Sequence, residues 1–99
     1  MSKYVQLDPE YVRARGRDVE KTSADMEKII SRMDSLLKDL QSNVKGDAMD
    51  GYTERYNKIK PTFKNAKELF DEVAHNLKET ANAIEETDKK IGNQYRGQA

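Results

Sequence analysis

The sequence predicts an all-α fold, an antiparallel hairpin (helix-turn-helix) of two long helices that turns near Val44-Lys45-Gly46. Three observations predict it: an apolar repeat of seven residues before the turn, a second such repeat after it, and turn-forming residues between them. The 99 residues are a single domain. We expect helices over about residues 8–42 and 48–92, a turn over 43–47 and a flexible tail over 93–99.

The first of these helices begins at Asp8. Its side chain is suited to accept from the unpaired N–H groups of the first turn, and Pro9 has no N–H to leave unpaired. Gly16 either weakens the helix or marks the close approach of another helix. Apolar residues form adjoining rows at seven-residue spacing: Val12, Val19, Met26, Met33 and Leu40, beside Ile29 and Leu36, with Ile30, Leu37 and Val44 on the other side. This amphipathic stripe is strongest from Met26 toward the turn.

The turn and the second helix are predicted from the same kinds of sequence signal. Gly46 permits a left-handed backbone conformation, and so short a connection makes the two helices antiparallel neighbours. Two further rows share the seven-residue spacing: Tyr56, Phe63, Phe70, Leu77, Ile84 and Ile91, beside Tyr52, Ile59, Ala66, Val73, Thr80 and Thr87. Pro61 cannot donate to the carbonyl of Asn57, so we expect a kink within one continuous helix. Gly92 predicts that this helix ends near residues 91–95.

Both apolar stripes are wider than one seam between two helices requires. Each large side chain left in water forfeits roughly 1.5–3 kcal/mol of burial. A second hairpin would cover the stripes and complete a four-helix bundle, so we expect the chain to pair. The residues expected in helix packing and the dimer interface are Val19, Met26, Ile30, Met33, Leu37, Leu40, Tyr56, Ile59, Phe63, Phe70, Val73 and Leu77.

The composition argues against several classes of function. Charged residues make up 36% of the chain, but Lys+Arg and Asp+Glu are equal at 18 each, so the basic excess of a nucleic-acid binder is missing. Arg13, Arg15 and Arg17 alternate around a helix and form no patch. No segment approaches the roughly 18 consecutive apolar residues of a membrane span, and we expect no cleaved signal peptide.

The residues also give little support to catalysis. The chain has no cysteine and one histidine, His75, whose acidic neighbours are better explained as a solvated helix face than as a metal site. Lys64 with Glu68 and Glu85 with Lys89 look like solubilising pairs along each helix. No phosphate loop or nucleophile motif is present. We therefore expect no enzyme activity and no cofactor.

Three stretches of the chain carry a resemblance to a known family. They are residues 7–10 at the entry of the first helix, residues 52–63 with their internal proline, and residues 77–91 near the end of the second helix. With the chain length and the turn glycine Gly46, they resemble the WXG-100 (ESAT-6-like) family of proteins exported by type VII secretion systems, in its Firmicutes form. The resemblance extends over nearly the whole chain.

Two site assignments follow from the resemblance. The family's turn motif corresponds to Val44 and Gly46, and Val44 stands in place of the motif tryptophan. In the family this tryptophan contributes to a surface that engages the secretion ATPase, and valine removes most of its aromatic area. The C-terminal export pattern of the family corresponds to Ile84, Asp88, Ile91 and Tyr95.

The resemblance implies a non-enzymatic protein exported as a folded dimer, acting as a secreted substrate, an adaptor or a virulence-associated factor. Its expected partners are a second copy or a paralogous family member, and the secretion ATPase. Its expected place is outside the cell or on the surface of a Gram-positive bacterium. Two other functions stay open, a membrane-active helical protein and a non-secreted cytosolic coiled-coil adaptor or chaperone. Zero net charge disfavours strong membrane contact.

Overall fold

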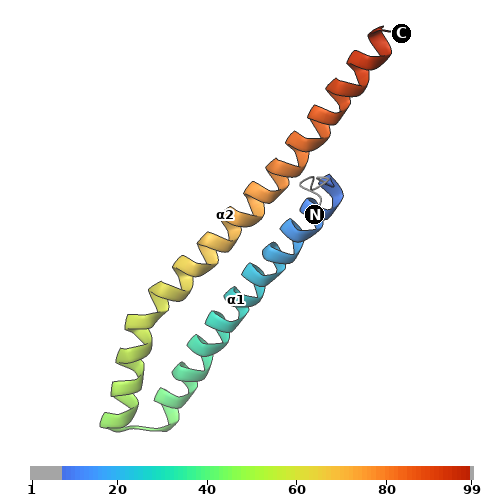
Figure 1. Ribbon diagram of the computed structural model, residues 1–99. Helices are drawn as coiled ribbons and strands as arrows, with labels where there is room; N and C mark the ends of the chain where they lie inside the picture. The colour runs from blue at the N-terminus through green and yellow to red at the C-terminus, as the bar shows by residue number, and fades with distance from the viewer. Residues whose placement is uncertain (1–7, 99) are drawn as a thin grey trace, which may run out of the picture.

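Two long helices, joined by a three-residue turn, account for the fold. The computed structural model describes residues 8–98, with α1 spanning Pro9–Asn43 and α2 spanning Asp47–Gln98. The helices lie side by side and antiparallel, forming a rod of 80 × 28 × 16 Å (Figure 1). The predicted all-α hairpin is thus confirmed.

The start of α1 has the cap that its sequence predicts. The Oδ1 atom of Asp8 accepts from the N–H of Glu10 at 2.9 Å, and Pro9 occupies the first helical turn. The backbone carbonyl of Asp8 accepts from the N–H of Val12 at 3.2 Å. The first bond satisfies an N–H group that a helix start leaves unpaired, and the second is the first backbone bond of the helix.

The turn consists of Val44, Lys45 and Gly46. The N–H of Val44 still donates to the carbonyl of Leu40 at 2.7 Å, but its extended backbone, at φ −126°, ends the helix. Gly46 has a φ of +150°, which side chains other than glycine's rarely permit. A Cβ atom at Gly46 would meet nothing within 4 Å, so its backbone conformation, and not lack of space, requires glycine.

The second helix is longer than predicted. It contains Pro61 without being divided, and Figure 1 shows α2 changing direction in its yellow-green part, where residue 61 falls on the colour bar. The helix continues to Gln98, so the predicted end near residues 91–95 was wrong, and residues 93–98 of the predicted tail are helical. The reason is that Gly92 weakens a helix by only about 1 kcal/mol and keeps its N–H and C=O in the ladder. Ala99 lies outside the described residues.

The difference in helix length leaves one end of α2 without a neighbour in the hairpin. α1 has 35 residues and α2 has 52. Arg13, near the start of α1, contacts Glu85 of α2 at 3.1 Å. The part of α2 that follows Glu85 extends past the start of α1 (Figure 1). The predicted export pattern lies at this overhang.

Candidate functional site

One long face of the hairpin is apolar and exposed. Among the described residues, ten of the twelve exposed large hydrophobic side chains fall between residues 29 and 73: Ile29, Met33, Leu36, Leu40, Val44, Tyr52, Ile59, Phe63, Leu69 and Val73. Ile29 and Tyr52 are each 62% exposed. Gathered exposed apolar side chains of this kind are typical of an interaction site. This apolar face is the candidate functional site.

The two sides of the seam between α1 and α2 differ in character. On one side, each α1 residue of the row 13, 20, 27, 34 and 41 contacts α2 through a polar group, and we call this side the polar seam. From the turn outward its contacts are Gln41–Thr53 at 2.8 Å, Asp34–Lys60 at 2.8 Å, Glu27–Lys67 at 3.9 Å, Glu20–Lys78 at 2.5 Å and Arg13–Glu85 at 3.1 Å. The apolar rows lie on the other side, so the hairpin has two distinct faces.

The polar seam has a three-residue cluster near the turn. The hydroxyl of Tyr56 donates to Oδ1 of Asp34 at 2.8 Å and also lies 3.2 Å from the carbonyl oxygen of Ile30. Lys60 donates to the other oxygen of Asp34. These bonds, first from Lys60 and then from Tyr56, lower the pKa of Asp34. Partial burial, together with the bond to Asp34, raises the pKa of Tyr56 to about 12.

A second cluster lies farther from the turn. Ser23 is 1% exposed, and its hydroxyl donates to Asp71 and lies 3.4 Å from the carbonyl oxygen of Lys67. The ammonium group of Lys67 donates to Asp71 at 2.7 Å. The bonds from Lys67 and then Ser23 lower the pKa of Asp71. A buried serine is therefore fully hydrogen-bonded at the contact between the helices.

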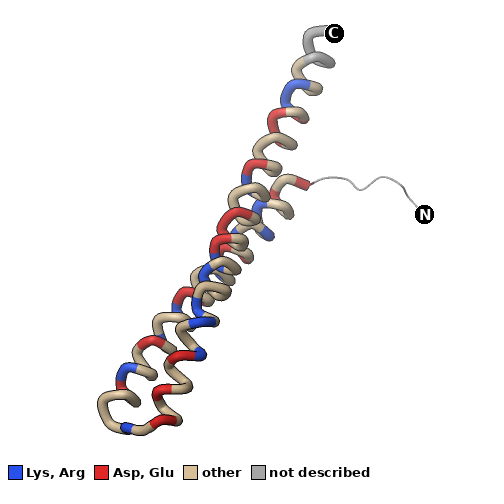
Figure 2. Tube along the Cα trace, turned by 90° about the vertical axis from the view of Figure 1, so that its left-hand side faces the viewer, with Lys and Arg blue, Asp and Glu red and all other residues tan. Residues whose placement is uncertain are grey.

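Many of these charges join the two helices, which was not predicted from the sequence. Glu85 was expected to pair along its own helix with Lys89, but it pairs with Arg13 of α1, which also donates to Asn82 at 3.0 Å. The hydrogen bond from Arg13 lowers the pKa of Glu85. The signal available in the sequence was that charged residues recur every seven positions in α1 beside the apolar row. Figure 2 shows both signs of charge interspersed along the two helices.

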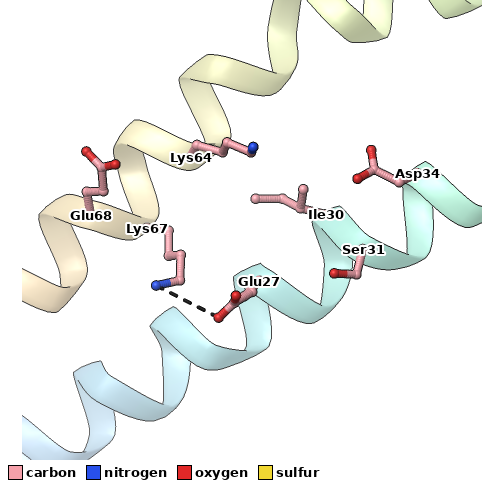
Figure 3. A pocket seen from close by; sticks show the side chains of 7 residues that line it. All are labelled: Glu27, Ile30, Ser31, Asp34, Lys64, Lys67 and Glu68. Carbon is pink, nitrogen blue, oxygen red and sulfur yellow. Dashed lines mark ion pairs between the residues drawn. The ribbon is translucent and has the colours of Figure 1, made fainter.

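A hollow of about 350 Å³ lies along the polar seam between the helices. Figure 3 shows Lys64 of α2 and Asp34 of α1 directed toward the space from opposite helices, with Glu27 paired to Lys67 at one end. Glu68, at the rim, points away from it. The lining mixes both charges in an open surface groove, and it lacks the enclosed, mostly apolar character of a small-molecule site.

Only one of the twelve residues expected in helix packing and the dimer interface is buried within the hairpin. Ile30 is 8% exposed. Six are half-buried: Val19, Met26, Leu37, Tyr56, Phe70 and Leu77. Five are exposed: Met33, Leu40, Ile59, Phe63 and Val73. The hairpin by itself therefore leaves most of this set available to a partner.

Small residues form a close contact between the helices, and of these only Gly16 was singled out in the sequence. Gly16, Ser23, Ala74 and Ala81 are buried. A Cβ atom built on Gly16 would lie 3.4 Å from the carbonyl oxygen of Ala74, so the expectation that Gly16 marks a close approach is met. The sequence signal for this contact is the spacing of the small residues: residues 16, 23 and 30 form one heptad row, and residues 74 and 81 form another.

These observations divide the hairpin into two parts. We call residues 24–73 the turn half, and residues 8–23 with 74–98 the open half. Two heptad rows have exposed apolar side chains in the turn half, ahead of the polar Asn43 that ends the first row: Ile29, Leu36, Tyr52, Ile59 and Val73. The same rows in the open half are polar: Arg15, Thr22, Thr80 and Thr87. The apolar face is therefore widest in the turn half.

The two motifs assigned by resemblance lie far apart in the hairpin. Val44 is 50% exposed in the turn, where it lines a shallow hollow with Met49 and neighbouring polar residues. At the other end, Ile84 is half-buried, Asp88 is exposed and Ile91 is 47% exposed. Side chains are described through Asn93, so that of Tyr95, the last member of the export pattern, lies outside the described part.

Within residues 8–93, no group of three or more His, Cys, Asp or Glu side chains is placed to hold a metal ion. His75 is exposed on α2. Over the same described part of the chain, neither helix has a segment long and apolar enough to cross a membrane.

Comparison with known proteins gives a consistent result over nearly the whole chain. Residues 5–89 match the family model WXG100, described as proteins of 100 residues with WXG. The chain is 30% identical to the protein YukE of Bacillus subtilis over 97 residues, covering 98% of this chain and 100% of that protein. It is 23% identical to the type VII secretion system extracellular protein A of Staphylococcus aureus over 91 residues, covering 92% and 94% of the two chains.

The fold has a solved counterpart as well. The crystal structure of EsxA from Geobacillus thermodenitrificans superposes with a TM-score of 0.85 at 27% sequence identity, covering 92% of this chain and 98% of that one. The helical hairpin, the turn glycine and the match over residues 5–89 agree with one another. The chain therefore belongs to the WXG100 family.

Proposed function

We propose that this protein is a non-enzymatic substrate of a type VII secretion system, exported as a folded dimer. The observation that carries the proposal is the exposed apolar face on a hairpin of the WXG100 family. A relative that covers most of the chain is named as a type VII extracellular protein. The ten large apolar side chains of this face are 37–62% exposed, and since full burial of such a side chain is worth roughly 1.5–3 kcal/mol, covering the exposed part of each favours pairing.

Pairing also accounts for the arrangement of charges. The polar seam uses its acids and bases within the hairpin, so its outer side stays hydrated when the apolar face is covered. Two apolar faces packed together form a four-helix bundle with a charged exterior. Such a dimer presents the turn with Val44 and the overhang of α2 at its ends, where a secretion ATPase can reach them.

The overhang is the proposed export signal. Asp88 and Ile91 follow Glu85, whose ion pair with Arg13 joins α2 to the start of α1, and both are exposed. Because they are not needed to hold the hairpin together, a change there acts on recognition and leaves folding intact. This separation makes the proposal testable with point variants.

The experiment measures export in the bacterium that encodes the chain and in a matched strain without the secretion ATPase. We expect the protein in the culture supernatant of the first strain only, without cleavage of its N-terminus. The double variant Asp88→Ala with Ile91→Ala should stay in the cells, while Lys89→Ala with Lys90→Ala, on the same helix turn, should be exported. Undiminished export of the first variant contradicts the assigned signal, and ATPase-independent release contradicts the function.

The turn provides a second test. Val44 occupies the position of the family's motif tryptophan, and it is half-exposed. If this chain itself engages the ATPase at the turn, Val44→Trp should increase binding to the isolated ATPase domain, because the larger ring adds apolar contact area. Val44→Thr, of the same shape, is the matched control. An unchanged affinity for the Trp variant would assign ATPase engagement to a paralogous partner.

A further inference from the structure

An arginine of α1 contacts α2 at the place where the assigned export pattern begins. This residue, Arg13, belongs to neither of the two motifs and pairs with Glu85, which directly follows the first residue of the pattern. We propose that Arg13 is a positioning residue for the export signal: it holds Glu85 against α1 and so fixes the direction in which the overhang of α2 presents the pattern. The inference rests on the proposed function, because it concerns how that signal is displayed.

Three polar side chains surround the guanidinium group of Arg13. Its Nη1 atom donates to the carboxylate of Glu85 at 3.1 Å and also to that of Glu10, in the first turn of α1. Its Nη2 atom donates to the side-chain oxygen of Asn82 at 3.0 Å. The two partners in α2 are three residues apart and lie on one side of the helix. Because the guanidinium group is planar and rigid, two bonds from it restrain the direction of α2 more than one bond would.

Loss of Arg13 would leave two acids facing each other. Glu10 and Glu85 come from different helices, and both contact the same nitrogen of Arg13. Without that base the two carboxylates would repel each other across the open end of the hairpin. The bond from Arg13 is the main cause that lowers the pKa of Glu85, and the charge of Lys89 contributes less. Lys89 belongs to α2 itself, so it cannot join the two helices.

The export pattern lies on the side of α2 that faces α1. Ile91 is one heptad beyond Ile84, which is half-buried, and Asp88 is one heptad beyond Ala81, which is buried. The overhang therefore presents the pattern on the side that is left open past the start of α1 (Figure 1). A protein that binds this side must also fit against the end of α1. The angle between the overhang and α1 then decides whether it fits.

The position of Arg13 near the end of α1 makes its effect on this angle large. Among the described residues, the next ion pair between the helices is Lys78 with Glu20, seven residues earlier on α2. Without Arg13, the last charged contact would move back by about 10 Å along the helix. The part of α2 whose direction α1 does not fix would be longer by that amount. A small change of direction would then displace the pattern farther.

Arg13 also distinguishes two acids that lie three residues apart. Glu85 is held by Arg13, whereas none of the ion pairs among the described residues includes Asp88. Asp88 is exposed, and it is the acid of the export pattern. The carboxylate that the pattern requires is therefore one that the hairpin leaves available.

Export of Arg13 variants tests the inference in the bacterium that encodes the chain. We expect Arg13→Ala to lower the ratio of protein in the supernatant to protein in the cells by about fivefold or more, since an attraction becomes a repulsion. Arg13→Lys keeps a charge between the two acids and should retain most of the export. The matched control is Lys78→Ala, which removes the neighbouring ion pair between the helices and should change export by less than about twofold.

A charge exchange separates positioning from folding. Arg13→Glu should lower export, and adding Glu85→Arg should restore it, because one base again lies between two acids from the two helices. Glu85→Gln loses the pair but leaves no facing acids, so it should lower export less than Arg13→Ala. Circular dichroism verifies that each variant keeps its helices.

A distance measurement supplies a readout besides export. The chain has no cysteine, so spin labels can be attached at Lys21→Cys and Glu86→Cys, both at exposed positions. Mixing with an excess of unlabelled chain leaves one labelled copy in each dimer. The distribution of distances between the labels should broaden in Arg13→Ala and become narrow again in the charge-exchanged variant, while Lys78→Ala should leave it nearly unchanged.

The outcomes distinguish this inference from the proposed function. Undiminished export of Arg13→Ala, an equal loss in Lys78→Ala, or no recovery on charge exchange would overturn Arg13 as a positioning residue. If Asp88→Ala with Ile91→Ala stays in the cells at the same time, the export signal stands and only this inference fails. Release that does not need the ATPase would instead overturn the proposed function, and this inference with it.

Discussion

The turn half and the open half of the hairpin follow the same heptad repeat but bury different side chains. In the turn half, Ile30 and Met49 are buried, whereas the open half buries Gly16, Ser23, Ala74 and Ala81. The turn half therefore leaves most of its large apolar side chains exposed on the apolar face. The open half instead uses small residues for close contact between its own helices, and its outward rows are polar.

The two halves of the hairpin therefore differ in role: the open half joins the two helices, and the turn half exposes a surface for a partner. Close packing of small residues holds the open half together without a partner, since Gly16 approaches the backbone of α2 and Ser23 is fully hydrogen-bonded. The turn half exposes the surface that a partner would cover. A hairpin built this way can fold first and pair afterwards. Four variants or conditions test the division, described here from the largest expected effect to the smallest.

Ile59→Glu should break pairing, and Thr87→Glu should not. Both residues belong to the same heptad row of α2, one in each half, and Ile59 is 49% exposed. In the proposed dimer the partner covers Ile59. The variant removes this side chain from both copies and places a carboxylate in an apolar interface, so the dissociation constant should rise by roughly a hundredfold or more. The measurement is the solution mass across a dilution series. Equal weakening by Thr87→Glu would show that the interface includes the open half.

Gly16→Leu should destabilise the open half by about 1–3 kcal/mol, because the side chain has no room against Ala74 and Leu77. The matched control is Gly51→Leu, at a helix position where a Cβ atom meets nothing within 4 Å. That change should stabilise by roughly 0.5–1 kcal/mol through helix propensity alone. Urea unfolding at fixed protein concentration measures both. A neutral Gly16→Leu would contradict the close approach.

Tyr56→Phe should cost about 0.5–1.5 kcal/mol, since it removes the hydroxyl that joins α2 to Asp34 and leaves the ring in place. Tyr52→Phe is the control, because its ring is 62% exposed on the same helix. The wild type should also lose stability as pH rises from about 10 toward 12, because the pKa of Tyr56 is raised to about 12 in the folded chain. This alkaline loss should be smaller in Tyr56→Phe, in which Lys67 still loses its charge at high pH, when unfolding is followed against pH.

Acid should weaken the polar seam slightly. The pKa values of Asp34, Asp71 and Glu85 are lowered in the folded chain, so their ionised forms stabilise the hairpin at neutral pH. That contribution is lost as pH falls below about 4, through the lowered pKa values. Thermal unfolding at pH 7 and pH 3 measures the change, and high salt at pH 7 should reproduce part of it. A melting temperature that rises in acid would contradict the role of the seam.

Much of the fold followed from local patterns. Asp8 and Pro9 predicted the start of α1, Gly46 the turn, and the two heptad repeats the helices, because caps, turns and amphipathic periodicity depend on neighbours in sequence. The end of α2 could not be predicted from such patterns. Gly92 signals a stop only weakly, and without a proline the backbone ladder continues to Gln98.

Only part of the candidate site could be predicted from the sequence. The rows at Met33 and Ile59 predicted which residues stay available to a partner, and both are exposed in the hairpin. Large residues were expected at the seam, and of the small residues only Gly16 was expected to mark a close approach, whereas the burial of Ser23, Ala74 and Ala81 was not predicted. The reason is that hydrophobicity favours large side chains while close helix packing favours small ones. Glu85 was expected to form a local pair, since its partner Arg13 is 72 residues away along the chain.

By itself, the sequence determined two amphipathic helices, their turn and an excess of apolar surface, all of which arise from residues a few positions apart. Only the tertiary structure decided how each helix is rotated toward the other. That rotation turns the small row at Gly16 and Ala74 inward, gathers Asp34, Lys60 and the other seam charges on one side, and leaves the apolar rows on the opposite side. The physical reason is that a helix with a wide stripe can pack at several angles. Close backbone approach and paired charges between the helices select one of them.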